Sequence, residues 1–272
     1  MSLAGKKIFI TGGSRGIGLE IAKRAARDGA LIAIAAKTSD PHPLLPGTIF
    51  TAAKEIEAAG GTALPIQCDI RDEAQIESSI AQAVAQFGGL DILVNNASAI
   101  NLTPTLDTPA KRFDLMFDIN VRGTFLVSQA AIPHLKQSAN PHILTLSPPI
   151  NLQGKWFKRH VAYTMSKYGM SMTVMGLAEE FKRDGIGINA LWPRTVIDTA
   201  ALQMIPGMDT VFCRKPEIMG DAAYAIFNLK ASDCTGNFFI DDEVLAEEGV
   251  SDLDKYAVVP GTTEFLKDLY LD

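Results

Sequence analysis

The chain has 272 residues, a net charge of −6 and a hydrophobic content of 47%. This length allows one α/β domain with a large core, and the charge gives no basic excess for non-specific binding to nucleic acid or an anionic membrane. The three cysteines form no Cys-x-x-Cys pair, which favours reduced thiols and a cytoplasmic protein. Neither an apolar signal region nor a continuous apolar run of about 18 residues is found, so no signal peptide or membrane span is expected.

Apolar runs alternate with helical patterns along the chain. Strands are expected at 6–11, 31–36, 63–68, 91–95, 142–147, 186–192 and 237–240. Helices are expected at 16–28, 48–59, 72–87, 111–136 and 162–183. This alternation predicts one α/β domain over residues 1–272, a Rossmann-type doubly wound parallel sheet of about seven strands with helices on both faces. A tail extends from about residue 243, and a short helix is expected at 265–271.

A glycine-rich turn joins the first expected strand to the first expected helix. It reads Thr-Gly-Gly-Ser-Arg-Gly-Ile-Gly over residues 11–18. Glycine lets the main chain approach a pyrophosphate closely, and the first N–H groups of a helix point at phosphates bound there. The turn therefore predicts a dinucleotide site. The contacts expected from it are Gly12, Ser14, Arg15, Gly16, Ile17 and Gly18.

Further motifs follow the turn in a fixed order. Asn-Asn-Ala-Ser at 95–98 ends the fourth strand, and Asn120 lies in the next helix. Ser147 ends the fifth strand, and Tyr163-x-x-x-Lys167 opens the helix after it. With the Thr-Gly-x-x-x-Gly-x-Gly spacing of the turn, these motifs resemble the short-chain dehydrogenase/reductase family over most of the chain. The resemblance implies an NAD(P)(H)-dependent oxidoreductase that interconverts a carbonyl and an alcohol, and a homodimer or homotetramer.

Tyr163 and Lys167 are four residues apart on an expected helix and so share one face. A phenol with a pKa of about 10 is a weak acid or base at neutral pH, but a nearby ammonium lowers that pKa. We therefore expect Tyr163 to be the general acid/base and Ser147 to hold the substrate oxygen. The resemblance adds Asn120, which supports a proton-relay water, and a bond from Lys167 to the nicotinamide ribose.

The expected cofactor is NADP(H) rather than NAD(H). Enzymes that prefer NAD carry an acidic residue at the end of the second strand, where this chain has Ala36. Lys37 follows, and Arg15 lies in the turn, so two cations are expected at the 2′-phosphate; the alternative is that both are solvated surface charges. By resemblance Asp69 contacts the adenine, with a helix N-cap as the alternative. The other expected cofactor contacts are Ile70, Asn96, Ala97, Pro193 and Val196. No metal site is expected.

Three segments depart from the common pattern. Residues 38–47 form a proline-containing loop, residues 152–160 lengthen the connection to Tyr163, and Arg194 replaces a glycine of the family motif. The aromatic pair Trp156 and Phe157 lines a pocket or, alternatively, anchors an exposed loop. Arg194 either faces an anionic substrate such as an acyl thioester or is a surface charge.

Segments 35–38, 95–100, 146–152, 190–195 and 235–242 resemble one subgroup of the family, the hydroxysteroid-dehydrogenase-like proteins of type two. Some members carry a sterol-carrier-like domain, which is not expected in this chain. The subgroup implies NADP-linked chemistry on a lipid-like or acyl substrate. The alternative function is an NADP(H)-binding sensor or scaffold without catalysis. The presence of Asn120, Ser147, Tyr163 and Lys167 argues against it, because a sensor needs no proton relay.

Overall fold

Seven parallel strands form the sheet in the computed structural model, which describes residues 2–41, 46–203, 207 and 209–272. The strands are β1 (Lys7–Thr11), β2 (Leu31–Ala36), β3 (Thr62–Gln67), β4 (Ile92–Asn95), β5 (His142–Thr145), β6 (Gly187–Trp192) and β7 (Phe238–Ile240). Their order is β3-β2-β1-β4-β5-β6-β7, with every neighbouring pair parallel. The chain runs from β1 outward to β3 and then returns to β4 beside β1, which confirms the predicted doubly wound sheet.

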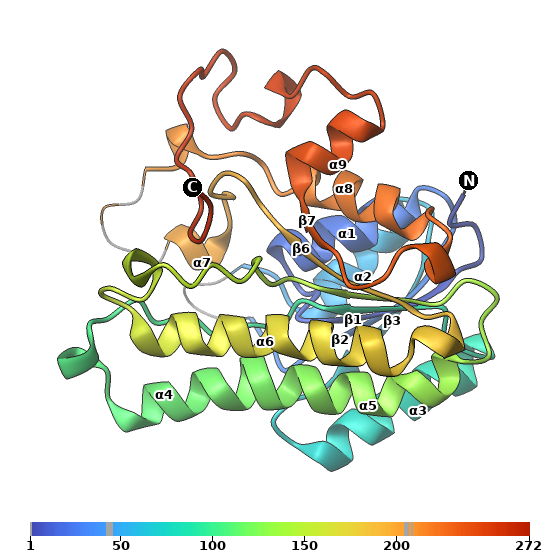
Figure 1. Cartoon of the computed structure of the whole chain (residues 1–272). Helices are drawn as coiled ribbons and strands as arrows, with labels where there is room; N and C mark the ends of the chain where they lie inside the picture. The colour runs from blue at the N-terminus through green and yellow to red at the C-terminus, as the bar shows by residue number, and fades with distance from the viewer. Residues whose placement is uncertain (1, 42–45, 204–206, 208) are drawn as a thin grey trace.

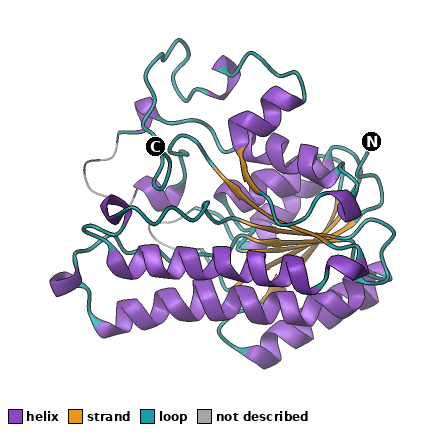
Figure 2. Ribbon diagram, in the orientation of Figure 1, coloured by secondary structure: helices purple, strands orange, loops and turns teal. Residues whose placement is uncertain are grey.

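Helices cover both faces of the sheet (Figure 1, Figure 2). One layer consists of α1 (Gly16–Ala26), α2 (Ile49–Ala58), α8 (Glu217–Phe227) and α9 (Asp241–Glu247). The other consists of α3 (Glu73–Phe87), α4 (Ala110–Met116), α5 (Thr124–Leu135) and α6 (Val161–Glu180), and a short α7 (Ala200–Gln203) follows β6. Successive side chains of a strand point to opposite faces, so Ile8 and Ile10 of β1 pack in the first layer and Phe9 in the second.

Several elements differ from the expectation, among them α7 and α9, which are not expected from the sequence. The helix expected at 111–136 is α4 and α5 joined by a π-helical stretch, Phe117–Gly123. No element is predicted at α8, although its half-buried residues Glu217, Asp221 and Tyr224 recur at helical spacing among eight buried residues. The helix expected at 265–271 is wrong. There Lys267 forms an antiparallel bridge with Thr195, and this pairing uses main-chain groups that a helix would need.

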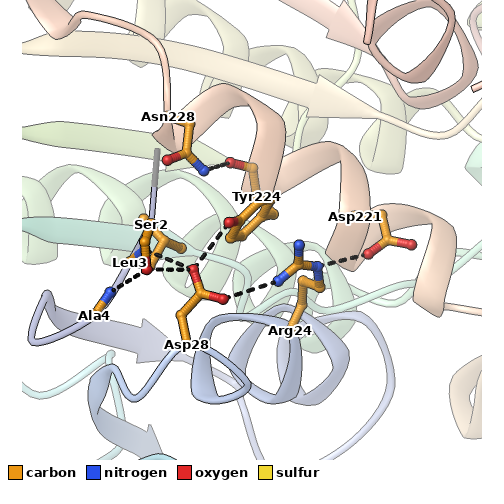
Figure 3. Close-up of polar contacts among 8 residues, drawn as sticks. All are labelled: Ser2, Leu3, Ala4, Arg24, Asp28, Asp221, Tyr224 and Asn228. Carbon is orange, nitrogen blue, oxygen red and sulfur yellow. Dashed lines mark hydrogen bonds and ion pairs between the residues drawn. The ribbon is translucent and has the colours of Figure 1, made fainter. Parts of the chain in front are cut away.

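A polar network ties the start of the chain to α1 and α8 (Figure 3). The Asp28 carboxylate accepts hydrogen bonds from the Leu3 N–H at 2.8 Å and the Tyr224 hydroxyl at 2.9 Å. The Arg24 guanidinium lies 3.3 Å from the Tyr224 ring centroid and binds Asp221 at 2.9 Å. These contacts fix α8 against α1, whose opposite end carries the glycine turn.

Within the described ranges, no helix has the length and apolar character needed to cross a membrane. The three cysteines, Cys68, Cys213 and Cys234, are buried free thiols. Burial raises the pKa of Cys213 to about 11 and raises the pKa values of the other two as well. All three therefore remain protonated near neutral pH, which does not suit a nucleophilic thiol.

Candidate functional site

The glycine turn closes tightly between β1 and α1. Gly12 and Gly16 have φ angles of +67° and +57°, a left-handed conformation that glycine adopts without strain. A Cβ at Gly12 would lie 2.8 Å from the Ala97 Cα, and one at Gly18 would lie 2.4 Å from Asn96 Nδ2. The main chain of the turn is therefore packed directly against the end of β4, with no room for side chains at these positions.

Asn96 fastens this turn to the sheet. Its side-chain amide donates to the Thr11 and Gly12 carbonyls at 2.9 and 3.0 Å. In return, Thr11 Oγ1 accepts the N–H groups of Asn96 and Ala97, each at 3.1 Å. The sequence motif assigns Asn96 to the cofactor. The geometry gives it a second task, because the shape of the turn depends on its amide.

A cavity of about 530 Å³ lies beside the turn at the carboxyl edge of the sheet. The predicted cofactor residues that line it are Gly12, Ser14, Arg15, Gly16, Ile17, Lys37, Asp69, Ile70, Asn96 and Ala97. Of the residues that the structure describes, five expected cofactor contacts lie outside this lining: Gly18, Tyr163, Lys167, Pro193 and Val196. The glycines that a Cβ would crowd and the helix N-terminus at Gly16 fit a dinucleotide, whose pyrophosphate needs close main-chain approach.

Two cations line the cavity near the end of β2, and they are held differently. Arg15 Nη2 donates to the Gly47 carbonyl at 2.8 Å, which ties the turn to the loop ahead of α2. The Arg15 Nε is buried and has no partner in the described part of the chain. Lys37 is exposed and forms no ion pair with any described residue. Lys37 is thus available to an anionic group, and Arg15 is partly engaged.

Asp69 follows β3 and binds the side chain of Arg71. Arg71 Nε donates to the two carboxylate oxygens at 3.0 and 3.1 Å, and these hydrogen bonds lower the pKa of Asp69. Asp72, rather than Asp69, caps α3 by accepting the Gln75 N–H at 3.1 Å. The N-cap alternative for Asp69 is therefore wrong, and its carboxylate lines the cavity next to the buried Ile70.

Ser147, Tyr163 and Lys167 are buried where β5 ends and α6 begins. Lys167 Nζ donates to the Leu146 carbonyl at 2.6 Å, so it lies next to Ser147. Tyr163 is one turn earlier on the same face of α6. Ser147 Oγ is buried and has no hydrogen-bond partner among the described residues. Leaving a buried hydroxyl unpaired costs free energy, so this oxygen is placed to bind a ligand.

Burial sets the acid–base state of this group. It lowers the pKa of Lys167 to about 7, and the negative charge of Asp268 opposes that shift. Burial also raises the pKa of Tyr163 well above its usual value, and the charges of Tyr270 and Asp268 add to the increase. Tyr163 is consequently protonated at neutral pH in this structure. Its raised pKa is opposite to the lowering expected from the Lys167 ammonium, because burial disfavours the phenolate.

Asn120 lies within the π-helical stretch and is fully buried. Its Oδ1 accepts the Ala99 N–H at 2.7 Å, and its Nδ2 donates to the Ala99 carbonyl and to Ser166 Oγ, each at 2.9 Å. These bonds join the loop after β4 to α6 at the residue before Lys167. π-Helical turns are frequent at functional sites. The side-chain amide of Asn120 is therefore fully engaged in joining these two segments.

The segment after β6 is hydrogen-bonded on both sides. The Val196 N–H donates to the Leu266 carbonyl at 2.9 Å, and the Val196 carbonyl accepts the Arg214 N–H at 3.0 Å. Ile197, the next residue, has no main-chain hydrogen bond to any described residue. Its N–H and carbonyl are thus available to a nicotinamide amide. The family motif assigns this contact to Val196. Ile197 becomes a candidate only because the hydrogen bonds of Val196 to the tail and to Arg214 are seen in the structure.

Trp156 and Phe157 pack inward. Their ring centroids lie 6.0 Å from that of Tyr270 and 5.6 Å from that of Tyr168, respectively. Both rings are partly buried and pack against the cluster that includes Tyr163. Residues 152–155, 158 and 159 are exposed, so the two rings anchor an exposed loop, and neither ring lines the cavity beside the glycine turn.

Arg194 is paired with two carboxylates of α9. Its Nε binds Asp242 at 2.8 Å, and its Nη2 binds Glu243. The two carboxylates neutralise the guanidinium, which is the arrangement expected of a surface charge. The interpretation of Arg194 as a recognition group for an anionic substrate loses its support.

The chain belongs to the short chain dehydrogenase family, which matches residues 6–208. This family uses nicotinamide nucleotides as cofactors. Among curated proteins the chain is similar to Hydroxysteroid dehydrogenase-like protein 2 of Danio rerio, at 62% identity, and of Homo sapiens, at 58%. Each match covers 99% of this chain but 65% and 64% of those proteins, so the chain spans just under two thirds of their length.

Solved structures agree with this assignment. A crystal structure from Xanthomonas campestris is 57% identical, with a TM-score of 0.97 and coverage of 100% of both chains. A short chain dehydrogenase from Mycobacterium thermoresistibile is 55% identical, with a TM-score of 0.94 and coverage of 100% of this chain and 96% of the other. The expected family, the subgroup resemblance and the fold are confirmed.

Proposed function

We propose that the protein is an NADP(H)-dependent oxidoreductase that interconverts a carbonyl and an alcohol. The observation that carries the proposal is the buried, unpaired Ser147 hydroxyl beside the Tyr163–Lys167 pair. When bound, the nicotinamide supplies or accepts the hydride. A sensor without catalysis would have no use for this hydroxyl and a buried protonated phenol.

Each of the four site side chains has its own role in the reaction. In reduction, Ser147 Oγ and the Tyr163 hydroxyl hold the carbonyl oxygen, and Tyr163 gives that oxygen its proton. The Lys167 ammonium stabilises the phenolate left on Tyr163, because opposite charges at short range favour the ionised form. Asn120 keeps the Lys167 turn of α6 in place through Ser166. In oxidation the same groups act in reverse.

The activity test uses a panel of apolar aldehydes and ketones with NADPH. We expect enzyme-dependent loss of NADPH absorbance with at least part of the panel. An apolar, lipid-like substrate is supported by the side chains around Tyr163, among them Trp156, Phe157 and Trp192. Tight NADPH binding with no turnover across the panel would instead establish the sensor function.

We expect the Lys37→Ala substitution to weaken NADPH binding about tenfold and to leave NADH binding unchanged. A charge-assisted hydrogen bond to a 2′-phosphate accounts for an effect of this size, and NADH lacks that phosphate. The control is Lys54→Ala, which removes an exposed lysine of α2 outside the cavity lining. Fluorescence titration measures both affinities. Equal losses for NADPH and NADH would reject the 2′-phosphate assignment.

We further propose a homodimer or homotetramer that uses the outer face of α5 and α6, which lie side by side (Figure 1). Met165, Met172 and Met175 on α6 are 45%, 57% and 52% exposed, and their spacing puts them on one side of the helix. Phe125 on α5 is 45% exposed. An exposed apolar face shared by two adjacent helices is typical of a subunit contact.

Met172→Glu is expected to shift the protein toward monomers in sedimentation velocity, because it places a carboxylate in the apolar contact. The control is Leu106→Glu, at a side chain that is 98% exposed in a different part of the surface. An unchanged sedimentation coefficient for Met172→Glu would exclude this face as the contact.

We also propose that residues 1–272 fold as a single domain and that the protein works in the cytoplasm. Three buried cysteines that form no disulfide support a reducing compartment. The packing of α9 and of the segment after it against the sheet supports the single domain.

A further inference from the structure

The last residues of the chain are bound to the segment that follows β6. The Asp268 N–H donates to the Arg194 carbonyl at 3.0 Å, and two residues earlier the Leu266 carbonyl accepts the Val196 N–H at 2.9 Å. On the other side, the Leu269 carbonyl accepts the Trp192 Nε1 proton at 3.0 Å. Hydrogen bonds to the Trp192 side chain and to the segment after β6 thus hold the main chain before and after Asp268.

Tyr270 holds the C-terminal tail in place through its buried side chain. Its side chain is 1% exposed. Its ring centroid lies 5.2 Å from that of Tyr168 and 5.9 Å from that of Trp192. Trp192 in turn lies under the Lys167 ammonium, at 5.0 Å. The tail is therefore part of the packed wall around the catalytic helix, and Asp268 belongs to that wall.

Asp268 is half-buried within this wall. Its Oδ1 accepts the N–H of Leu269 at 2.6 Å, and it forms no direct ion pair with any described residue. Burial raises its pKa to about 7. The titratable groups near Asp268 are Tyr163, Lys167, Cys213, Asp241 and Tyr270. His160 lies beside the Tyr163 ring, and the positive charge of Arg214 acts on Asp241.

Asp268 is the carboxylate whose charge acts on Lys167. The contacts of the Lys167 ammonium are the Leu146 carbonyl, the Met170 sulfur at 3.4 Å and the Trp192 ring, none of which carries a charge. The negative charge of Asp268 raises the pKa of Lys167 and also that of Tyr163. Both effects have the same sign, because a nearby negative charge favours the protonated form of either group.

We propose that Asp268 is a positioning residue of the active site, whose carboxylate keeps the proton on the Tyr163–Lys167 pair and suits the site to carbonyl reduction. The inference rests on the proposed function and adds a direction to it. In reduction the Tyr163 O–H bond breaks and its proton goes to the carbonyl oxygen. The carbonyl carbon takes the hydride that the reduced nicotinamide supplies, and the alcohol is the product.

The test is the pH dependence of kcat/KM in Asp268→Asn, which removes the charge and keeps an oxygen to accept the Leu269 N–H. For reduction, we expect the alkaline limb of the kcat/KM profile to shift to lower pH by about one unit. This is the size expected for one charge acting across a protein site. Below the limb the variant keeps the rate of the wild type. For oxidation, which needs the Tyr163 phenolate, the acid limb moves down as well, so the variant gains activity at low pH.

The matched control is Glu264→Gln, the same change of charge at an exposed position of the same tail. It is expected to leave both limbs unchanged. A loss of rate in Asp268→Asn that is equal at every pH would show a merely structural role and overturn the proposal. A shift of the same size in Glu264→Gln would also overturn it, because the effect would then belong to the net charge of the protein.

A second measurement needs no turnover. In protein labelled with 13C at lysine Cε, the Lys167 signal is assigned by its loss in Lys167→Met and is followed against pH by NMR. We expect the Asp268→Asn protein to show a lower Lys167 pKa than the wild type, and an unchanged pKa would reject the proposal. A lowered pKa in a protein that turns over no carbonyl compound would support the charge effect of Asp268 and reject the proposed function.

Discussion

Tyr163→Phe is expected to lower kcat about 1000-fold and to change the Kd for NADPH less than twofold. General acid–base groups contribute about 10²- to 10⁴-fold, and this substitution removes the proton donor alone. The ring stays in its place, because Tyr163 is packed beside His160 with a centroid separation of 6.5 Å. Steady-state rates with the best carbonyl substrate and fluorescence titration of NADPH provide the two measurements.

Tyr168→Phe is the matched control for this result. It makes the same change five residues further along α6, where the hydroxyl donates to the Asn151 carbonyl at 2.6 Å. Losing that bond loosens the loop before α6 and is expected to cost less than about tenfold in kcat. Comparable kcat values in the two variants would reject the assignment of Tyr163 as the proton donor. Retention of the wild-type rate by Tyr163→Phe would do the same.

The sequence predicts those parts of the site that depend on local order along the chain. The glycine turn is predicted because a buried strand, closely spaced glycines and a helix follow one another directly. Tyr163 and Lys167 are predicted because their spacing on a helix fixes a common face. The doubly wound parallel sheet is predicted as well, since alternating strands and helices have few possible arrangements.

The parts that were not predictable depend on contacts between distant segments. Asn96 closes the turn through the Gly12 carbonyl, 84 residues earlier in the chain. The tail reaches the active site through the Trp192–Leu269 bond, which spans 77 residues. Neither Asp268 nor Tyr270 belongs to a periodic pattern, so no local rule selects them. Both residues reach the active site because the tail is hydrogen-bonded to the Trp192 side chain and to the segment after β6.

Gly12→Ala is expected to raise the Kd for NADPH at least about 100-fold, which corresponds to about 2.7 kcal/mol of binding free energy. The added Cβ would lie 2.8 Å from the Ala97 Cα, a main-chain atom that cannot rotate away. Relief requires the turn to separate from β4, and this breaks the bonds of Thr11 Oγ1 to the Asn96 and Ala97 N–H groups. Fluorescence titration of NADPH and the midpoint of thermal unfolding measure the two consequences.

Gly5→Ala separates backbone strain from crowding. Gly5 has a φ of +68°, against +67° at Gly12, but a Cβ at Gly5 meets nothing within 4 Å. The two substitutions therefore carry the same left-handed strain, about 1 kcal/mol, and differ in the space around the new methyl group. We expect Gly5→Ala to lower the unfolding midpoint slightly and to bind NADPH as the wild type does. If Gly12→Ala behaved in the same way, glycine at position 12 would serve the backbone conformation alone. A large loss confined to Gly12→Ala would show that the cofactor site depends on the direct contact between the turn and the end of β4.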